Sequence, residues 1–331
     1  MKVLVTGSEG FIGSHLVERL VAADHTVTAL VQYNSFNSLG WLDTIPASTR
    51  EKIKVVLGDV RDSGSVRSAV EGQHRVAHLA ALIAIPYSYV APRSYLETNA
   101  LGTLNVLDAC RDFGVERLIH TSTSEVYGTA QYVPIDEKHP LVGQSPYSAS
   151  KIAADQLAHS YWTSFGVPIV TLRPFNAYGP RQSERAFIPS VIVQLLGGAS
   201  PISLGALEPT RDLTYVGDTA DGFLKAIESD LGLGEVFNMG SGFEISMGEV
   251  VEILRIISGR AFEVVQDKER LRPDASEVER LWSDSSRMGD EFGWWPEHAG
   301  KEGLRQGLEK TYSWFKALPA SSTHGVSKYV I

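Results

Sequence analysis

The sequence predicts an α/β protein, with a doubly wound parallel sheet and a second, smaller subdomain. Three observations lead to this prediction. Short apolar segments alternate with segments of helical periodicity from residue 2 to residue 172, which is the pattern of a parallel sheet. A glycine-rich turn joins the first apolar segment to the first helix. After residue 174 the alternation gives way to shorter segments punctuated by glycine and proline.

The composition is that of an ordinary globular protein. The chain has 331 residues, 43% of them hydrophobic and 21% charged, which is enough for one large domain and a smaller one. The formal net charge of -9 argues against a nucleic acid or an anionic membrane as partner. Its one cysteine, Cys110, excludes an internal disulfide framework and favours a cytoplasmic location.

Targeting segments and metal sites are not expected. A strand-like run follows Met1 directly, so we expect no signal peptide, and no stretch approaches the ~20 apolar residues of a membrane span. The closest histidine pair, His74 and His78, is spaced for a helix but lies in a strand-like segment. The sequence therefore predicts no metal.

The first strand and the turn after it give the clearest local signal. Lys2–Thr6 is the expected strand, and a helix follows the glycine spacing Gly-x-x-Gly-x-x-Gly. A helix N-terminus offers free backbone amides and a favourable dipole to an anion, and glycine lets a pyrophosphate come close. We therefore predict a dinucleotide site of the Rossmann type, formed by Gly7, Gly10, Phe11, Ile12 and Gly13.

The second expected strand, Thr26–Val31, bears on the choice between NAD and NADP. An acidic residue usually ends this strand and holds the ribose hydroxyls of NAD, but this chain has Gln32 there. No arginine or lysine follows until Arg50, so no cation stands ready for the 2'-phosphate of NADP. We predict NAD for want of that charge, and NADP stays open.

Further strands are expected at 53–57, 75–79, 117–121 and 169–172, with helices ending near residue 71 and spanning about 95–113 and 147–165. Ligands of such a sheet lie at the carboxyl ends of the strands. Asp59 could accept a hydrogen bond from the adenine amino group, or could be a cap or turn residue. Further predicted cofactor contacts are Val60, Leu79, Ala80, Ala81 and Asn99.

The stretch Tyr147-Ser-Ala-Ser-Lys151 places a phenol and an ammonium on one face of a helix, one turn apart. A nearby cation favours the phenolate, so we expect Lys151 to lower the pKa of Tyr147 from about 10 toward neutrality. Tyr147 would then serve as a general base for a sugar or alcohol hydroxyl.

Four motifs stand in a characteristic order: the glycine turn, Thr123 to Gly128 (Thr-Ser-Glu-Val-Tyr-Gly), Tyr147 to Lys151, and Arg173 to Pro180. From Met1 to about residue 316 the sequence resembles the extended short-chain dehydrogenase/reductases that act on nucleotide sugars. It is most similar to their 4,6-dehydratases of the N-acetylglucosamine and mannose type. The resemblance implies the catalytic residues Thr123, Glu125, Tyr147 and Lys151.

The resemblance also implies how the substrate and the chain are arranged. The partner would be a nucleotide-diphosphate sugar, held by Thr123, Ser124, Asn176, Arg181, Arg211 and Arg272. Residues 1–174, with a returning segment at about 212–240, would bind the dinucleotide. Residues 175–316 would form the substrate-binding subdomain, and 317–331 a poorly ordered tail. A homodimer would pair through the helices at about 95–113 and 147–165, whose apolar residues include Leu101 and Leu107.

The predicted reaction depends on Glu125. Oxidation at the sugar C4 would acidify the C5 proton, and a carboxylate could then remove it as water leaves across C5 and C6. Simple 4-epimerases usually have a small residue at this position, so Glu125 favours a 4,6-dehydratase. Ser124 stands where many dehydratases carry an aspartate, which leaves the second acid open. The alternatives are a 4-epimerase, including a uronate 4-epimerase, a UDP-glucuronate decarboxylase, and a non-catalytic NAD(P)-sensing module.

Overall fold

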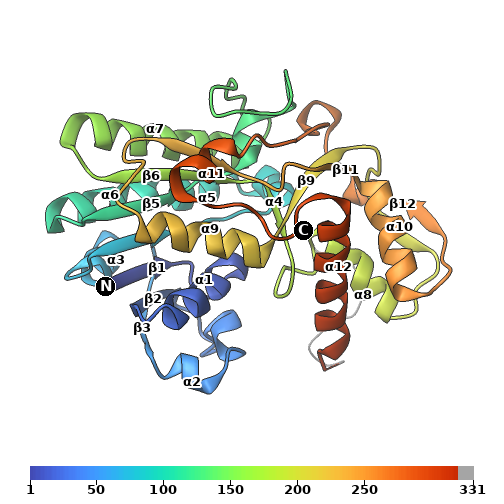
Figure 1. The fold of residues 1–331 in the computed structure, drawn as a ribbon, viewed down its shortest axis with the longest axis horizontal. Helices are drawn as coiled ribbons and strands as arrows, with labels where there is room; N and C mark the ends of the chain where they lie inside the picture. Colours follow the sequence, from blue (N-terminus) through green and yellow to red (C-terminus); the bar gives the residue numbers. More distant parts are fainter. Residues whose placement is uncertain (320–331) are drawn as a thin grey trace.

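The computed structural model of the chain describes residues 1–319 (Figure 1). Its centre is a seven-stranded sheet in the order β10-β6-β5-β4-β1-β2-β3, with every neighbouring pair parallel. The strands are β1 (Lys2–Thr6), β2 (Thr26–Gln32), β3 (Ile53–Gly58), β4 (Arg75–His78), β5 (Arg117–Thr121), β6 (Ile169–Pro174) and β10 (Val236–Met239). This arrangement confirms the predicted doubly wound parallel sheet.

Helices cover both faces of the sheet, because alternate residues of its strands point to opposite sides. In β1, Val3 and Val5 pack into one core and Leu4 into the other. The first core takes in α1 (Phe11–Ala22), α9 (Val216–Glu228) and α11 (Ser286–Phe292). The second takes in α3 (Ser63–Val70), α6 (Gly102–Phe113) and α7 (Pro146–Phe165).

Local sequence signals fix the ends of α7, the helix that carries Tyr147. Ser145 and Ser148 form a reciprocal capping box at its start, and Pro146 occupies the first turn. The helix ends at Gly166, whose φ of 68° is the left-handed conformation that glycine adopts without strain. The segment expected as one helix at 95–113 consists of α5 (Pro92–Tyr95), a π-helical segment η2 (Leu96–Leu101) and α6.

The second lobe has its own core and lies on the right of Figure 1. It contains a three-stranded sheet of β11 (Glu244–Ser246), β9 (Thr210–Tyr215) and β7 (Asn176–Tyr178), and a two-stranded sheet of β12 (Val264–Gln266) and β8 (Ile202–Leu204). Helices α8 (Phe187–Leu196), α10 (Met247–Ser258) and α12 (Gly300–Ala317) pack around them. The remaining short elements are α2 (Ala47–Arg50), α4 (Ile85–Val90), η1 (Gly40–Asp43), η3 (Ser124–Tyr127), η4 (Lys268–Arg270) and η5 (Asp274–Ser276).

The chain returns to the large domain more than once. The returning segment includes α9 and the edge strand β10, both within the predicted range of about 212–240. A further segment differs from the predicted boundaries, because Met288, Phe292 and Trp294 pack into the first core of the sheet domain and not into the lobe. Of the predicted tail, Ala317 ends α12, and residues 320–331 lie outside the described part. No helix within residues 1–319 is both long and apolar enough to cross a membrane.

Candidate active site

The turn between β1 and α1 can be built only with glycine at two of its positions. Gly7 has a φ of 65°, and a Cβ there would lie 2.8 Å from the backbone of Ala80. A Cβ on Gly13 would lie 2.1 Å from the carbonyl oxygen of Gly7. The turn therefore packs directly against the end of β4. Gly10 caps α1 without a side-chain hydrogen bond, so the first amides of the helix stay available to an anion. These features fit the pyrophosphate of a dinucleotide.

The segment after β4 is fixed by side chains on both sides. Thr6 Oγ1 accepts from the amides of Leu79 and Ala80, each at 3.1 Å. Asn99 accepts from the amide of Leu82 at 2.8 Å and donates to its carbonyl at 2.9 Å. Its second N–H goes to Ser150 Oγ at 3.0 Å. Both donors of Asn99 are thus used within the protein, where they position this backbone, and its direct contact with the cofactor stays a prediction.

The predicted contacts at the ends of β2 and β3 have protein partners. Asp59 accepts from the Arg61 guanidinium at 2.6 Å and from the Arg61 amide at 2.9 Å, and the side-chain bond lowers the pKa of Asp59. The turn role of Asp59 is therefore present, and its contact with adenine stays a prediction. Val60 packs against Gly102, while the amide of Gln32 donates to Glu9 Oε1 at 2.9 Å.

Tyr147, Thr123 and Lys151 come together at the carboxyl end of β5. Tyr147 and Lys151 lie one turn apart on α7, and all three residues are buried. The Lys151 ammonium donates to the carbonyl oxygen of Thr121 at 2.7 Å. The ring of Tyr95 packs edge-on against that of Tyr147, with centroids 6.2 Å apart. The predicted grouping of a hydroxyl, a phenol and an ammonium thus exists in the fold.

The pKa of Tyr147 differs from the expectation. Burial raises it, and a side-chain hydrogen bond with Thr123 acts in the opposite direction with a smaller effect. The nearby Glu125 carboxylate also raises it. Burial lowers the pKa of Lys151 to about 8, against the opposing influence of Asp155. The sequence argument considered only the charge of the lysine, whereas desolvation disfavours the charged form of both groups.

A buried polar network lies beside the predicted catalytic residues, and the sequence reasoning missed it. Asp155 accepts from the hydroxyl of Ser122 at 2.8 Å and from Arg173 Nη2 at 3.0 Å, and its other oxygen lies 3.0 Å from His120 Nε2. Burial alone would raise the pKa of Asp155, but these partners outweigh it and lower the pKa to about 2. The signal was available, since Asp155 follows Lys151 by four residues and shares its helix face.

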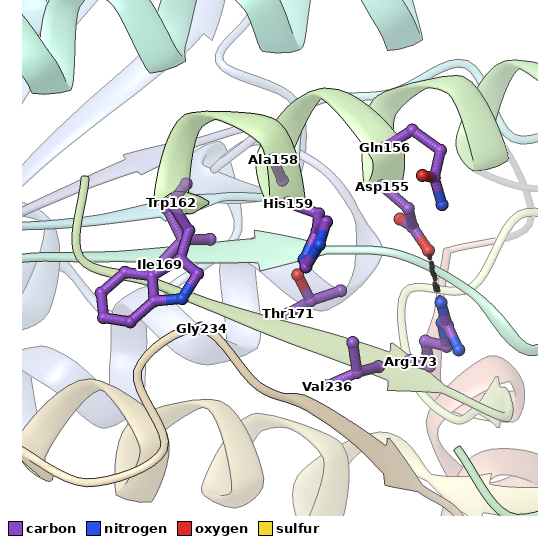
Figure 2. Close-up of a pocket in the computed structure, with 10 residues that line it drawn as sticks. All are labelled: Asp155, Gln156, Ala158, His159, Trp162, Ile169, Thr171, Arg173, Gly234 and Val236. Atoms are coloured by element: carbon purple, nitrogen blue, oxygen red, sulfur yellow. Dashed lines mark hydrogen bonds and ion pairs between the residues drawn. The ribbon is translucent and has the colours of Figure 1, made fainter. Parts of the chain in front are cut away.

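A cavity of about 270 Å³ lies beside this network, between α7 and the edge of the sheet (Figure 2). Figure 2 shows the pair formed by Asp155 and Arg173 at one end of the cavity and Trp162 at the other. None of the predicted catalytic side chains lines it. The predicted catalytic residues therefore lie outside this cavity, at the strand ends.

The predicted substrate side brings two arginines and two carboxylates together. Arg211, on β9, donates to Glu277 Oε1 at 3.1 Å. Arg272 Nη1 lies 3.6 Å from the same oxygen and 3.9 Å from Glu125 Oε2. This Nη1 atom is buried and makes no hydrogen bond. Glu125 is buried too, so the cluster holds charged donors that the protein itself does not fully satisfy. Sequence reasoning missed Glu277, which no motif marks.

The other predicted substrate contacts are placed as follows. Asn176 begins β7, and its Oδ1 is buried without a hydrogen-bond partner. Ser124 is buried beside Glu125 in η3. Arg181 contacts α1, where its Nη1 lies 2.5 Å from Glu18 Oε2 and 3.3 Å from Ser14 Oγ. The contacts of Arg181 are thus different from those of Arg211 and Arg272.

One group within residues 1–319 has the spacing of a metal site, with the ligand atoms of Asp218, Glu297 and His298 within 4.8 Å of one another. His298 Nδ1 lies 3.0 Å from Asp218 Oδ1, and its Nε2 lies 2.8 Å from the Lys310 ammonium. Both ring nitrogens therefore have partners, and the ammonium opposes a cation. His78 likewise bonds Thr6 and Thr103 through its two nitrogens.

Comparisons with known proteins agree with this geometry. A family model described as GDP-mannose 4,6 dehydratase matches residues 4–307. A dTDP-glucose 4,6-dehydratase of Actinoplanes sp. is 33% identical, over 96% of this chain and 98% of that protein. A putative UDP-glucose 4-epimerase of Methanocaldococcus jannaschii is 32% identical, over 95% of this chain and 98% of that protein.

Solved structures of both activities share the fold. The dTDP-glucose 4,6-dehydratase DesIV of Streptomyces venezuelae, solved with NAD, superimposes with a TM-score of 0.83 at 29% identity, over 96% of this chain and 97% of that one. The UDP-glucose 4-epimerase of Thermus thermophilus, also solved with NAD, gives a TM-score of 0.83 at 31% identity, over 96% and 99%.

Proposed function

The chain belongs to the GDP-mannose 4,6-dehydratase family of NAD-dependent nucleotide-sugar enzymes, and on that premise we propose that it is a nucleotide-sugar 4,6-dehydratase. The placement of Glu125 carries the proposal. This buried carboxylate lies 3.9 Å from Arg272 Nη1 and is close enough to Tyr147 to raise its pKa, so it is near both the predicted general base and the arginine cluster. A base at that point can reach a sugar held from both ends.

The first half of the proposed reaction is oxidation at C4. The glycine turn would hold NAD, which when bound would supply the hydride acceptor for the oxidation and the hydride donor for the later reduction at C6. Tyr147 removes the proton of the C4 hydroxyl, and Thr123, close enough to the phenol to influence its pKa, bonds the same sugar oxygen. The Lys151 ammonium, one helical turn from Tyr147, provides the positive charge that favours the phenolate over the phenol.

The second half is the elimination of water. The C4 ketone acidifies the C5 proton, Glu125 removes it, and the electron pair forms the double bond as the C6 hydroxyl departs. The departing hydroxyl needs a proton. Because Ser124 stands beside Glu125 in place of a second acid, we assign this transfer to Glu125 as well, which passes on the proton that it took from C5. When the hydride returns to C6, C5 takes up a proton from solvent, delivered through Glu125.

Product mass tests the proposal. The purified protein is incubated separately with dTDP-glucose, GDP-mannose, and UDP- and GDP-N-acetylglucosamine, and the products are weighed by mass spectrometry. A product lighter by one water molecule supports the dehydratase. If all these sugars return unchanged while UDP-glucuronate is converted at constant mass, the proposal is wrong and Glu125 is a binding residue.

A 4-epimerase is the second candidate, and Ser124 is the observation that favours it. An epimerase needs no acid for a leaving group, because it only rotates the ketone and takes the hydride back. Its product keeps the mass of the substrate and differs in retention time. A UDP-glucuronate decarboxylase would give a product lighter by one carbon dioxide molecule, and an NAD(P)-sensing module would leave every sugar unchanged.

We propose that the protein acts in the cytoplasm as a homodimer, paired through the outer faces of η2, α6 and α7. Leu96 and Leu101 in η2 are 50% and 48% exposed, whereas Leu107 is fully buried against the sheet. The apolar surface for pairing would therefore lie at the η2 end of this face. Light scattering should give twice the mass of one chain, and Leu101→Glu should give the single chain. A single-chain mass for the unmodified protein at micromolar concentration rejects the dimer.

A further inference from the structure

Glu9, inside the glycine turn, holds its carboxylate at the carboxyl end of β2. Its Oε1 accepts a hydrogen bond from the amide of Gln32, the last residue of that strand, at 2.9 Å. Its Oε2 is buried and has no hydrogen-bond partner. A buried carboxylate oxygen without a donor is unfavourable by about 1–3 kcal/mol or more, so such a group calls for an explanation.

The neighbouring loop holds Glu9 in this position. The amide of Trp41 donates to the carbonyl oxygen of Glu9 at 3.0 Å. Gly40, with a φ of 58°, packs so closely that a Cβ there would lie 2.8 Å from the same carbonyl oxygen and 3.0 Å from Glu9 Cβ. The side chain is therefore fixed at its base and tied at one oxygen, while the second oxygen is left for a donor from outside the protein.

The end of β2 is where a nucleotide fold holds the adenosine ribose of its cofactor. β2 pairs with β1 up to Leu30 opposite Thr6, immediately before the glycine turn. The acidic residue that usually ends this strand is absent, because Gln32 stands there. The loop from Tyr33 to Thr49 contains no arginine or lysine. Its carboxylate at Asp43 is already used, accepting from the amide of Leu39 at 2.8 Å.

We propose that Glu9 replaces the missing acid of β2: its free oxygen accepts a hydrogen bond from a ribose hydroxyl of NAD, and its charge rejects the 2'-phosphate of NADP. Glu9 is thus a specificity-determining residue supplied by the glycine turn. The inference rests on the cofactor of the family and not on the sugar reaction. Burial raises the pKa of Glu9, as expected for a carboxylate that lacks donors for one oxygen.

Equilibrium binding tests the inference without turnover. Full-length protein, freed of nucleotide that co-purifies with it, is titrated calorimetrically with NAD, NADP and the 2'-deoxy and 3'-deoxy forms of NAD. The variants are Glu9→Gln, which keeps the size and an acceptor for the Gln32 amide, and Glu9→Ala. Asp43→Asn is the matched control, because it removes one negative charge from the neighbouring loop after β2. The melting temperature of each nucleotide-free variant reports folding.

We expect the unmodified protein to bind NAD at least ~10-fold more tightly than NADP. It should bind one of the two deoxy analogues about 10-fold less tightly than NAD. Glu9→Gln should weaken the binding of NAD about 10-fold and strengthen the binding of NADP. It should also bind NAD and the deoxy analogue with the same affinity. Asp43→Asn should change the ratio of NAD to NADP affinity by less than about 2-fold.

Three results overturn the inference. The first is a preference for NADP in the unmodified protein, and the second is an NAD to NADP ratio that Glu9→Gln leaves unchanged. The third is a loss of affinity for the deoxy analogue that is as large in Glu9→Gln as in the unmodified protein. This comparison does not need Glu9→Ala, so it holds even if that variant does not fold. Sugar conversion is measured separately by product mass, so failure of the dehydratase proposal leaves these binding results interpretable.

Discussion

Glu125 and Arg272 face each other at 3.9 Å between Oε2 and Nη1, close enough for their charges to attract but too far apart for a hydrogen bond. The Arg272 nitrogen is buried without any hydrogen-bond partner. A carboxylate in this position is held by charge and keeps its lone pairs free. This is the state that a base for the C5 proton requires.

Glu125→Gln should remove that base while keeping the shape of the side chain. We expect turnover of the nucleotide sugar to fall at least ~100-fold, which is typical of the loss of a general base. Exchange of the C5 proton with deuterium from solvent, followed by mass spectrometry, should fall in parallel. Glu277→Gln is the control, because it neutralises the neighbouring carboxylate that pairs with Arg211. Normal C5 exchange in Glu125→Gln would assign the base elsewhere.

Tyr147→Phe should lower turnover at least ~100-fold, because it removes the group that takes the C4 proton. Binding of NAD, measured by titration, should change little. Tyr95→Phe is the matched control: its ring packs on Tyr147, but its hydroxyl donates to the carbonyl of Ala84. The control should keep turnover within a few fold. Near-normal turnover in Tyr147→Phe would remove Tyr147 from the mechanism.

The arginine cluster should act on substrate binding more than on the chemical steps. Arg211→Lys replaces a planar, bidentate donor with a single ammonium, so we expect KM for the nucleotide sugar to rise about 10-fold. The kcat should fall by less than that. Arg255→Lys, at an exposed pair with Glu252, should leave both constants unchanged. A 10-fold fall in kcat with an unchanged KM would instead place Arg211 among the groups that act only in the transition state.

The buried charge of Lys151 should make stability depend on pH. Burial lowers its pKa from 10.5 to about 8, so between these values the unfolded chain binds more protons and stability rises with pH. From pH 8 to pH 9.5 this amounts to about 2 kcal/mol, at 1.36 kcal/mol per pH unit. Tyr147 does not oppose it there, because its raised pKa matters only above pH 10.

Denaturant unfolding of the nucleotide-free protein measures this effect. The free energy of unfolding should rise from pH 8 to pH 9.5 relative to Lys151→Met, which lacks the titrating group. Parallel curves for the two proteins across this range would show that the ammonium is solvated and not buried.

The network around Asp155 should contribute strongly to stability. Asp155→Asn leaves the buried Arg173 guanidinium without its counter-charge, and breaking a buried pair in this way costs about 3–5 kcal/mol. Asp112→Asn is the control, because its pair with Arg67 is exposed and screened by solvent and should contribute little. Urea unfolding compares the two. Equal losses would mean that Arg173 finds another partner.

Much of the fold could be predicted from the sequence because its signals are local. A parallel strand buried on both faces is a short apolar run, and the turn after β1 needs glycine for steric reasons that its spacing reveals. Tyr147 and Lys151 are four residues apart on one helix, so their meeting follows from helix geometry alone.

The contacts that could not be predicted join residues far apart in the chain. Arg211 and Glu277 meet across 66 positions, and Glu9 reaches Gln32 across 23. The packing of Met288 and Trp294 into the sheet domain depends on where the chain turns back, which apolar residues alone do not specify. The pKa of Tyr147 was mispredicted because burial, unlike spacing, is a property of the whole fold.

The way the chain passes between the lobes limits how they can move and unfold. The chain leaves the sheet after β6, returns as α9 and β10, and comes back again at Met288 to Trp294 before α12 ends in the other lobe. Neither lobe is a continuous stretch, so no single cut releases one of them as a complete fold. Calorimetry should accordingly record one melting transition. Closure of the two lobes over a ligand must bend all the connecting segments at once, which favours a small rotation of one lobe over a large hinge motion.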